Sequence, residues 1–453
     1  MNLYQHQTDS LKRTKGFNRV AYYHDMGLGK TFTGAEKMIQ LGKRVNLVIC
    51  QKSKIDDWCE HFVDNYELSH NMMIYDCTKW NKADWLLFSN DIDFIKDAHQ
   101  QDITVLIINY ELCWRRKQLL QLHDFTLMLD ESSLIQNIKA KQTKFIMNLQ
   151  PSDVILLSGT PVSGKYENIV TQAHLLGWNI SQEIYDRTYV NWTLTPDDGS
   201  GMRHRIVDMS NPYKNVDRLK DKLRQYGADF LKTEDVLDLP EQTFIDVWVD
   251  APKEYKKFMK EDYVLLKNVI PFTDDFGVDP AYFQSDVELI GDTTFTKRLY
   301  ARQLCSQYNK NKIEALTDLI QSTQDRLIIF YNFNDELNIL KGVCNKQKRP
   351  YSEVNGSVKD LSNYEECDNS VTLVQYQAGA MGLNLQKCNK IIYFSLPERS
   401  ELFEQSKKRI HRIGQSQPCF YYVMMAKNTV ESDIYETLKM RRDYTDELFK
   451  EVK

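Results

Sequence analysis

Phosphate chemistry is suggested by the segment Gly27-Leu-Gly29-Lys30-Thr31, which leads from an apolar stretch into a pattern with helical periodicity. In such a turn, glycines let backbone N–H groups face phosphate oxygens, and the start of the helix adds positive potential. Lys30 would reach the outer phosphates and Thr31 would hold a magnesium ion. A strict P-loop has glycine where His24 stands. The segment predicts a nucleotide phosphate site, with a plain glycine-rich turn as the structural alternative.

Two adjacent acids, Asp130 and Glu131, directly follow the apolar run 127–129. An acid at the carboxyl end of a parallel strand lies where ligands bind in α/β sheets. There Asp130 would hold magnesium through water, and Glu131 would polarise the attacking water. The structural alternative is an acidic turn that caps the next helix.

A third segment, Ser158-Gly-Thr160-Pro161, also follows an apolar run. Its small hydroxyl residues can hydrogen-bond to acids or to groups beside a phosphate, although an ordinary β-turn has the same composition. Its place after the other two segments favours the functional interpretation. Together the three segments indicate a site that hydrolyses a nucleoside triphosphate.

The second half of the chain contributes Gln405, Arg409 and Arg412. Their spacing predicts that all three lie on one face of a helix, so that their planar donors project toward a single site. A phosphoryl group in transfer needs such positive donors, and an arginine that arrives from a second domain couples hydrolysis to domain closure. A solvated basic helix is the alternative.

The elements that must position these residues are indicated by short β-branched runs that alternate with helical patterns in both halves. This alternation is typical of parallel sheets joined by crossover helices. The pattern predicts strands at 45–50, 105–108, 126–129 and 154–157, and again at 327–330, 371–375, 390–394 and 420–424. We therefore expect an α/β protein with one parallel sheet in each half.

The chain has 453 residues, more than a single hydrophobic core usually organises, so two domains are expected. Pro240 marks the boundary because proline interrupts regular structure, which gives domains 1–240 and 241–453. Two segments fit the alternation poorly and are predicted to be insertions. These are residues 178–235, with a turn-rich DDGSG centre, and residues 252–300, which are predicted to form charged helices around the acidic loop PFTDDFGVDP.

Taken in order, the three phosphate-site segments resemble motifs I, II and III of helicase superfamily 2. The second half is similar to the SWI/SNF-like branch of that superfamily. Gln375-Tyr-Gln-Ala-Gly-Ala-Met-Gly382-Leu-Asn384-Leu looks like its motif V, and Glu404-Gln-Ser-Lys-Lys-Arg-Ile-His-Arg-Ile-Gly-Gln415 looks like its motif VI. Shorter matches resemble the N-terminal glutamine motif at 3–7, motif Ia at 48–53, motif Ib at 107–111 and motif IV at 328–333.

This resemblance implies two RecA-like P-loop NTPase lobes with parallel sheets and helical insertions, ATP as the nucleotide, and Mg²⁺. The catalytic residues it implies are Lys30, Asp130, Glu131, Arg409 and Arg412. The nucleotide-binding residues are Gln7, Gly27, Gly29, Lys30, Thr31, Gly382 and Gln405, and the Mg²⁺ residues are Thr31 and Asp130. The nucleic-acid contacts are Ser53, Tyr110 and Asn384.

Motif II departs from the family pattern. It reads Asp-Glu-Ser-Ser, where many relatives carry histidine at the position of Ser133. The contact that this histidine makes between motifs II and III is therefore in question. The catalytic acids, Asp130 and Glu131, are retained.

The composition limits which partners, cysteine-based sites and cellular locations are expected. The formal net charge of −5 neither supports nor excludes a nucleic-acid groove. The nine cysteines occur singly, without zinc-ligand or disulfide spacing. Neither a long apolar run nor a secretory signal is visible, so we expect no membrane span and a cytoplasmic location. Because no accessory domain flanks the motifs, we expect a compact bacterial or bacteriophage type, in bacterial or phage-infected host cytoplasm.

The function that the resemblance implies is a DNA-dependent ATPase that moves along DNA, in phage or bacterial replication, recombination or repair. Duplex DNA is favoured over single strands, and contacts to the backbone would make binding independent of sequence. A strand-separating helicase uses the same motor and stays open. An ATP-driven protein switch without nucleic acid is the alternative from another class, and a motif V of the Gln-x-Gln-Ala-Gly type argues against it.

Overall fold

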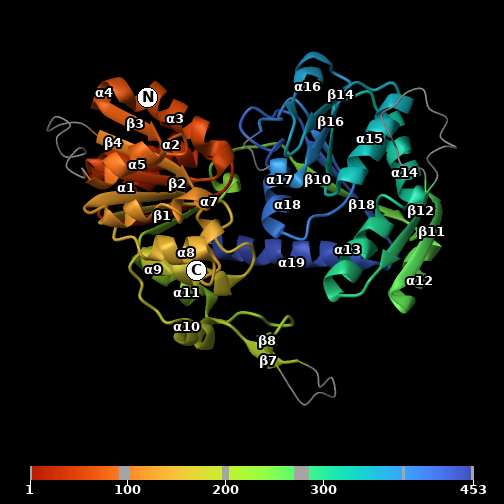
Figure 1. Cartoon of the computed structure of the whole chain (residues 1–453), viewed down its shortest axis with the longest axis horizontal. Coiled ribbons are helices and arrows are strands. Elements are labelled where there is room, and N and C mark those ends of the chain that lie inside the picture. Colours follow the sequence, from red (N-terminus) through yellow and green to blue (C-terminus); the bar gives the residue numbers. More distant parts are fainter. Residues whose placement is uncertain (1–2, 91–102, 196–203, 270–284, 380–382, 450–453) are drawn as a thin grey trace. The chain divides into compact units, whose positions relative to one another are not determined.

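A computed structural model describes residues 3–90, 103–195, 204–269, 285–379 and 383–449. The chain divides into two compact units, residues 1–237 with 443–453, and residues 238–442 (Figure 1). We call them lobe 1 and lobe 2. Within the described residues, no helix is both long enough and apolar enough to cross a bilayer.

Lobe 1 is built on a seven-stranded sheet with the strand order β3-β4-β2-β5-β6-β1-β9. All of its strand pairs are parallel. The strands are β1 (Arg19–His24), β2 (Val45–Cys50), β3 (Met72–Asp76), β4 (Ile103–Asn109), β5 (Phe125–Asp130), β6 (Asp153–Leu157) and β9 (Ala228–Leu231). The helices of this lobe include α1 (Gln5–Arg13), α2 (Lys30–Leu41), α3 (Ile55–Phe62), α8 (Lys141–Met147), α9 (Val170–Leu175) and α11 (Val216–Gln225).

Both faces of this sheet are buried, which explains the continuous apolar strands. Tyr22 and Tyr23 are neighbours in β1, and each is fully buried in a different hydrophobic core. Side chains that follow each other along a strand point to opposite faces. The strand is therefore apolar at successive positions instead of alternating.

Lobe 2 contains a second seven-stranded sheet, in the order β10-β18-β17-β13-β16-β14-β15. Its pairs are parallel except for β14 with β15. The strands are β10 (Gln242–Val249), β13 (Leu327–Tyr331), β14 (Tyr351–Val354), β15 (Lys359–Asp360), β16 (Val371–Gln375), β17 (Lys390–Tyr393) and β18 (Cys419–Ala426). The helices include α14 (Lys310–Gln321), α15 (Asn334–Lys346), α16 (Ser362–Glu366), α17 (Tyr376–Gly379), α18 (Ser400–Lys407) and α19 (Val430–Phe449). The predicted fold, two RecA-like α/β lobes, is confirmed.

The segment 252–300 is not purely helical, which corrects the prediction. Helices α12 (Lys253–Glu261) and α13 (Thr294–Cys305) flank an antiparallel hairpin of β11 (Tyr263–Val269) and β12 (Ser285–Ile290). In β11, Val264 and Leu266 are buried while Tyr263 and Leu265 are exposed. This period of two is a strand signal. The acidic loop at 271–280 lies outside the described residues.

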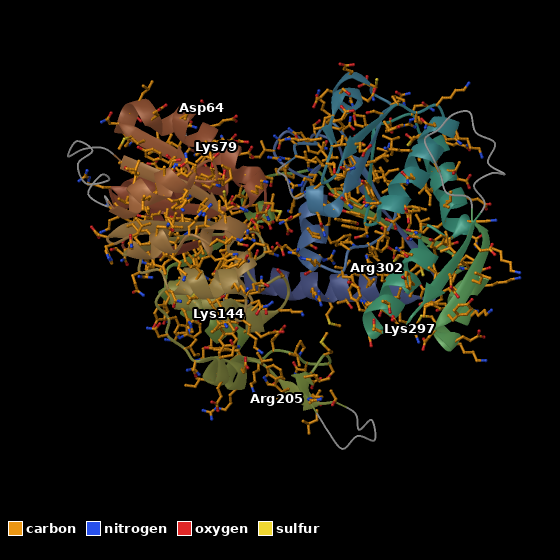
Figure 2. The ribbon with its side chains drawn as sticks, in the orientation of Figure 1. Asp64, Lys79, Lys144, Arg205, Lys297 and Arg302 are labelled. Atoms are coloured by element: carbon orange, nitrogen blue, oxygen red, sulfur yellow. The ribbon has the colours of Figure 1, made fainter. Side chains whose placement is uncertain are left out.

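The segment 178–235 is also only in part an insertion. Its last strand, β9, pairs with β1 and belongs to the main sheet of lobe 1. A separate hairpin of β7 (Trp192–Leu194) and β8 (Arg205–Val207) forms a two-stranded sheet of its own. On it, the Arg205 guanidinium lies 4.8 Å from the centre of the Trp192 ring. Figure 2 labels Arg205. The DDGSG turn lies outside the described residues.

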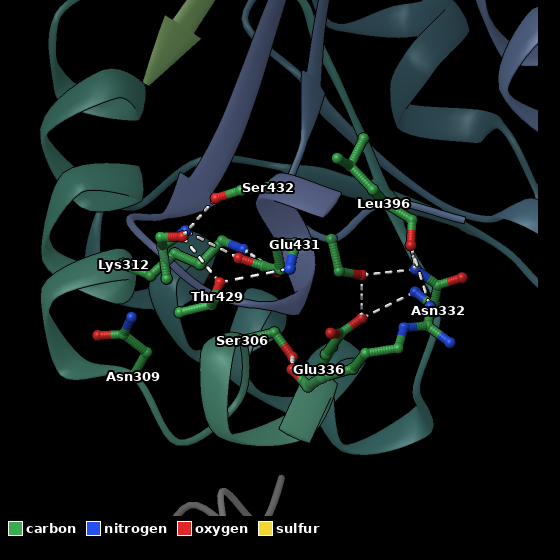
Figure 3. A network of polar contacts seen from close by, with 12 residues as sticks. Ser306, Asn309, Lys312, Asn332, Glu336, Leu396, Thr429, Glu431 and Ser432 are labelled. Carbon is green, nitrogen blue, oxygen red and sulfur yellow. Dashed lines mark hydrogen bonds and ion pairs between the residues drawn. The ribbon is translucent and has the colours of Figure 1, made fainter. Parts of the chain in front are cut away.

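A buried polar network organises the carboxyl ends of the lobe 2 strands (Figure 3). Glu336 is fully buried, and its Oε2 accepts hydrogen bonds from the backbone N–H of Asn332 at 2.8 Å and from the Ser395 hydroxyl at 2.8 Å. Close by, the Lys312 ammonium donates to Glu431 Oε1 at 2.6 Å. One carboxylate thus ties the loop after β13 to the loop after β17.

Candidate active site

The predicted site segments of lobe 1 meet at one edge of its sheet. Strands β2, β5, β6 and β1 are neighbours in that order and run parallel. Their carboxyl ends therefore lie side by side. Motif Ia begins in the last residues of β2, and Asp130 of motif II is the last residue of β5. Motif III follows β6 and the P-loop follows β1.

The P-loop has the backbone that its glycines predict. Gly27 has a φ of 89° and Gly29 a φ of 70°, a left-handed conformation that favours glycine. Lys30 begins α2, and its ammonium donates hydrogen bonds to the carbonyls of His24 at 2.9 Å and Asp25 at 3.2 Å. A Cβ added to Gly159 of motif III would lie 3.4 Å from Lys30 Nζ. The lysine is therefore held between the P-loop and motif III.

Gln7 braces the P-loop from α1. Its amide Nε2 donates to the carbonyls of Leu28 at 3.3 Å and Gly29 at 3.1 Å, and its Oε1 accepts from the backbone N–H of Tyr4 at 2.9 Å. A Cβ on Gly29 would come within 2.3 Å of that Nε2. Both the backbone and Gln7 thus require glycine at position 29. The contact between Gln7 and adenine that the resemblance implies stays a prediction.

His24, which stands where a strict P-loop has glycine, points into the interior. Its ring is fully buried, and Nε2 lies 2.9 Å from Asp229 Oδ2. The guanidinium of Arg13 binds both oxygens of Asp229, at 2.7 and 3.0 Å. Burial raises the pKa of Asp229, but the hydrogen bonds from His24 and Arg13 outweigh it and hold that pKa at about 2. The departure from the motif is therefore accommodated inside the lobe, away from the phosphate loop.

In motif II, Asp130 closes β5 and its Oδ2 accepts a hydrogen bond from the Trp58 indole at 2.9 Å. Burial raises the pKa of Asp130, against the indole hydrogen bond and the nearby charges of Lys54 and Lys30. A cation beside this carboxylate would favour its ionised form. Thr31 lies in the first turn of α2. A carboxylate and a hydroxyl at one sheet edge are oxygen donors of the kind that Mg²⁺ prefers.

Tyr110 is a correction to the predicted nucleic-acid contacts. Its side chain is 1% exposed, and its hydroxyl donates to the carbonyl of Asp130 at 2.9 Å. The residue directly follows β4 and its ring belongs to a hydrophobic core of lobe 1, where it supports motif II instead of meeting a polymer. Ser53 is exposed in the short helix at 52–54 that follows β2, and it remains a candidate.

A glutamine that the sequence did not single out connects motif II to motif III. The Ser132 hydroxyl donates to Gln172 Oε1 at 2.8 Å, and Gln172 Nε2 donates to the carbonyl of Pro161 at 2.7 Å. Ser133, at the position of the family histidine, is buried, and its hydroxyl makes no hydrogen bond within the described chain. A contact between motifs II and III thus exists in this protein, but Gln172 makes it instead of a histidine at position 133.

In lobe 2, the prediction that Gln405, Arg409 and Arg412 share one helix face is wrong. Helix α18 ends at Lys407, so both arginines follow the helix. Ile410 is fully buried, and the backbone N–H of Leu385 donates to the carbonyl of Arg409 at 3.1 Å. These contacts draw the backbone out of the helical path.

Motif VI is instead fixed as a loop against motif V. The Gln415 amide donates to the carbonyls of residues 386, 388 and 410. The Arg412 guanidinium donates to the exposed Asn384 side chain, and burial lowers the pKa of Arg412. Gln405 and Arg409 are buried. The predicted nucleotide contact Gly382 lies outside the described residues.

Comparison with known proteins assigns the chain to a family. The sequence model of the SNF2-related domain matches residues 17–312, more than half of the chain, and that of the helicase conserved C-terminal domain matches residues 311–414. The chain belongs to the SNF2-related family, as its motifs predicted.

The curated relatives are distant in sequence. "Uncharacterized ATP-dependent helicase YqhH" of Bacillus subtilis is 24% identical, with 91% of this chain and 73% of the relative covered. "Chromodomain-helicase-DNA-binding protein 1-like" of Mus musculus is 22% identical, over 91% of this chain and 45% of its own length. The chain spans less than half the length of the first four relatives, at 45%, 40%, 48% and 38%.

Among solved structures, the Sulfolobus solfataricus SWI2/SNF2 ATPase core in complex with dsDNA aligns with a TM-score of 0.41 and 17% identity, over 98% of this chain and 92% of that chain.

Proposed function

We propose that this protein hydrolyses ATP in response to duplex DNA and uses the energy to move along it. The observation that carries the proposal is the meeting of Lys30, Asp130 and the motif III turn at one edge of the lobe 1 sheet. Family membership adds the expectation that a polymer stimulates turnover. The proposed domains are residues 1–240 and 241–453.

Each site residue of lobe 1 has a role in this proposal. Thr31 and Asp130 hold Mg²⁺, partly through water, and that ion would neutralise charge on the outer phosphates. Lys30, freed from its carbonyl contacts, binds the same phosphates, and the Gly27 and Gly29 backbone cradles them. Glu131 orients the attacking water and accepts its proton.

Lobe 2 supplies the charge that hydrolysis needs in the transition state. Arg409 and Arg412 meet the nucleotide bound by lobe 1 when ATP closes the lobes, with Gln405 and Gly382 beside them. Because the charge on the phosphoryl group develops during transfer, such arginines act on the rate more than on affinity.

The DNA contacts are proposed for loops that follow the strands. Ser53 and Asn384 are exposed there and would bind phosphate oxygens. Backbone binding of this kind is independent of sequence and weakens as salt rises. The Bacillus relative suits a bacterial setting, and a cytoplasmic role in DNA replication, recombination or repair is part of the proposal.

The experiment is ATP turnover measured without polymer and with duplex DNA, single-stranded DNA and RNA. We expect duplex DNA to give the largest stimulation. A protein whose turnover ignores every polymer would be the ATP-driven switch instead. A strand-displacement assay on a forked duplex separates the translocase from the strand-separating helicase, which uses the same residues.

A further inference from the structure

Gln172 on α9 is fully buried and contacts three separate segments of the site. Its Oε1 accepts hydrogen bonds from the hydroxyls of Ser132 at 2.8 Å and Tyr23 at 3.1 Å, and its Nε2 donates to the carbonyl of Pro161 at 2.7 Å. Tyr23 precedes the P-loop in β1, Ser132 follows Glu131, and Pro161 lies in motif III. One amide therefore connects the strand before the P-loop, the residue after Glu131 in motif II, and motif III.

The residue beside this junction has an unusual backbone. Glu131 has a φ of 54°, in the left-handed region that residues with a side chain rarely adopt. Such a conformation persists only where the surroundings fix it. On its N-terminal side, Tyr110 holds the carbonyl of Asp130, and on its C-terminal side Gln172 holds the hydroxyl of Ser132.

We propose that Gln172 is a positioning residue for hydrolysis, which keeps Glu131 oriented and ties the movement of motif III to motif II. The inference rests on the proposed ATPase function and deepens it. Gln172 itself does not contact the nucleotide. It acts through Ser132, and it makes the link that a histidine at position 133 makes in many relatives.

The geometry predicts a rate effect without an affinity effect. Gln172→Met keeps a similar volume but removes all three hydrogen bonds. Since a displacement of about 1 Å at a reacting group costs about a hundredfold in rate, kcat should fall by roughly tenfold to a hundredfold. The Kd of a slowly hydrolysed ATP analogue should change by less than about threefold, because Lys30 and the P-loop glycines keep their contacts.

The matched control is Thr171→Val on the same helix. The Thr171 hydroxyl is buried and donates to the carbonyl of Ile135 at 2.9 Å, without joining two motifs. The Thr171→Val substitution therefore removes one buried hydrogen bond from the same part of the lobe. We expect some loss of thermal stability and nearly unchanged kcat.

A second variant gives a signature that a merely structural role would not produce. Gln172→Glu keeps one oxygen that can accept from Ser132 and Tyr23, but the second oxygen, which replaces Nε2, can donate to the Pro161 carbonyl only when the carboxyl group is protonated. Burial raises the pKa of such a carboxyl group. The ratio of its kcat to that of the wild type should therefore rise as the pH is lowered from 8 to 6.

The test is to measure kcat with saturating duplex DNA, the Kd of the ATP analogue, and the melting temperature for all variants. A folded Gln172→Met protein with wild-type kcat, or with equal losses in kcat and affinity, overturns the inference. If that variant does not fold, Ser132→Ala decides: a lower kcat supports the inference and an unchanged kcat overturns it. A wild-type protein that hydrolyses no ATP overturns the proposed function, whereas active variants beside an active wild type overturn only the role of Gln172.

Discussion

The two lobes hold their predicted site residues in different ways. In lobe 1, side chains from distant segments fix each motif: Gln7 braces the P-loop, Trp58 binds Asp130, and Gln172 joins motifs II and III. In lobe 2, the arginines follow the end of α18, and Arg412 is held by the exposed Asn384. A site built like the first is organised before its ligand arrives, whereas an arginine held like Arg412 can exchange its partner.

The largest effect that this comparison predicts is at Lys30. Lys30→Ala should abolish detectable ATP turnover because the outer phosphates lose their cation. The fold should persist, since the ammonium's hydrogen bonds to the carbonyls of His24 and Asp25 stay within its own loop. Phosphate release measured with malachite green checks the loss of turnover, and thermal unfolding followed by circular dichroism checks that the fold persists. Retained turnover in a folded variant would contradict the phosphate-site assignment.

Glu131→Gln should come next, with hydrolysis blocked and ATP affinity retained. The amide can still lie beside water but cannot accept its proton. Single-turnover hydrolysis and binding of a fluorescent ATP analogue separate these effects. An equal loss of binding would show that the left-handed turn at Glu131, and not its carboxylate, was disturbed.

Arg412→Ala tests the lobe 2 half of the comparison. Turnover should fall by roughly a thousandfold, as for other arginines that act on a transferring phosphoryl group, with little change in ATP affinity. Arg412→Lys should rescue poorly because a point charge cannot reproduce the planar contact. Near-normal DNA-stimulated turnover in Arg412→Ala would refute the two-lobe mechanism.

Asn384→Ala is the matched control for that variant. It removes the observed partner of Arg412 and leaves the guanidinium in place. If Arg412 exchanges partners during the cycle, turnover at saturating DNA should change far less than in Arg412→Ala. A loss as large as that in Arg412→Ala would show that the exposed contact itself is required.

The sequence predicted the parts of the molecule that depend on local pattern. All eight predicted strands exist, because buried parallel strands are apolar along their whole length and end at recognisable turns. Strands such as β9 and β10 escaped notice because they lie at the sheet edges and carry polar residues. The β11–β12 hairpin was taken for helix because charged residues such as Lys267 and Glu288 are among its exposed positions.

The site residues also divide into those that a local sequence pattern predicts and those that it does not. Motif residues are adjacent in sequence, so their chemistry could be predicted, whereas Asp229 and Gln172 act on residues 205 and 40 positions away. Helical spacing misplaced Arg409 and Arg412 because the burial of Ile410 and the pairing of Leu385 with Arg409 override the local pattern. Tyr110 was misassigned because a motif label does not tell whether a side chain is buried.

The smallest effect that we predict concerns the buried anchor of lobe 1, Asp229. Its folded pKa of about 2 lies below the ordinary value of about 3.9, so it stabilises the fold above pH 4 and loses this contribution as the pH falls toward 2. The difference corresponds to roughly 2–3 kcal/mol in the free energy of unfolding.

Asp229→Asn should therefore be less stable at pH 7 and should show a shallower loss of stability between pH 4 and 3, measured by urea unfolding. Burial lowers the pKa of His24, so that residue also opposes folding in acid, but from about pH 6.5 downward. His24→Gln is thus the control that changes a different pH window. Turnover at pH 7 should fall little in Asp229→Asn, because Lys30 bonds to the backbone carbonyl of His24, which the substitution leaves in place. If the acid limb of Asp229→Asn matches that of the wild type, the anchor does not govern the stability of the lobe.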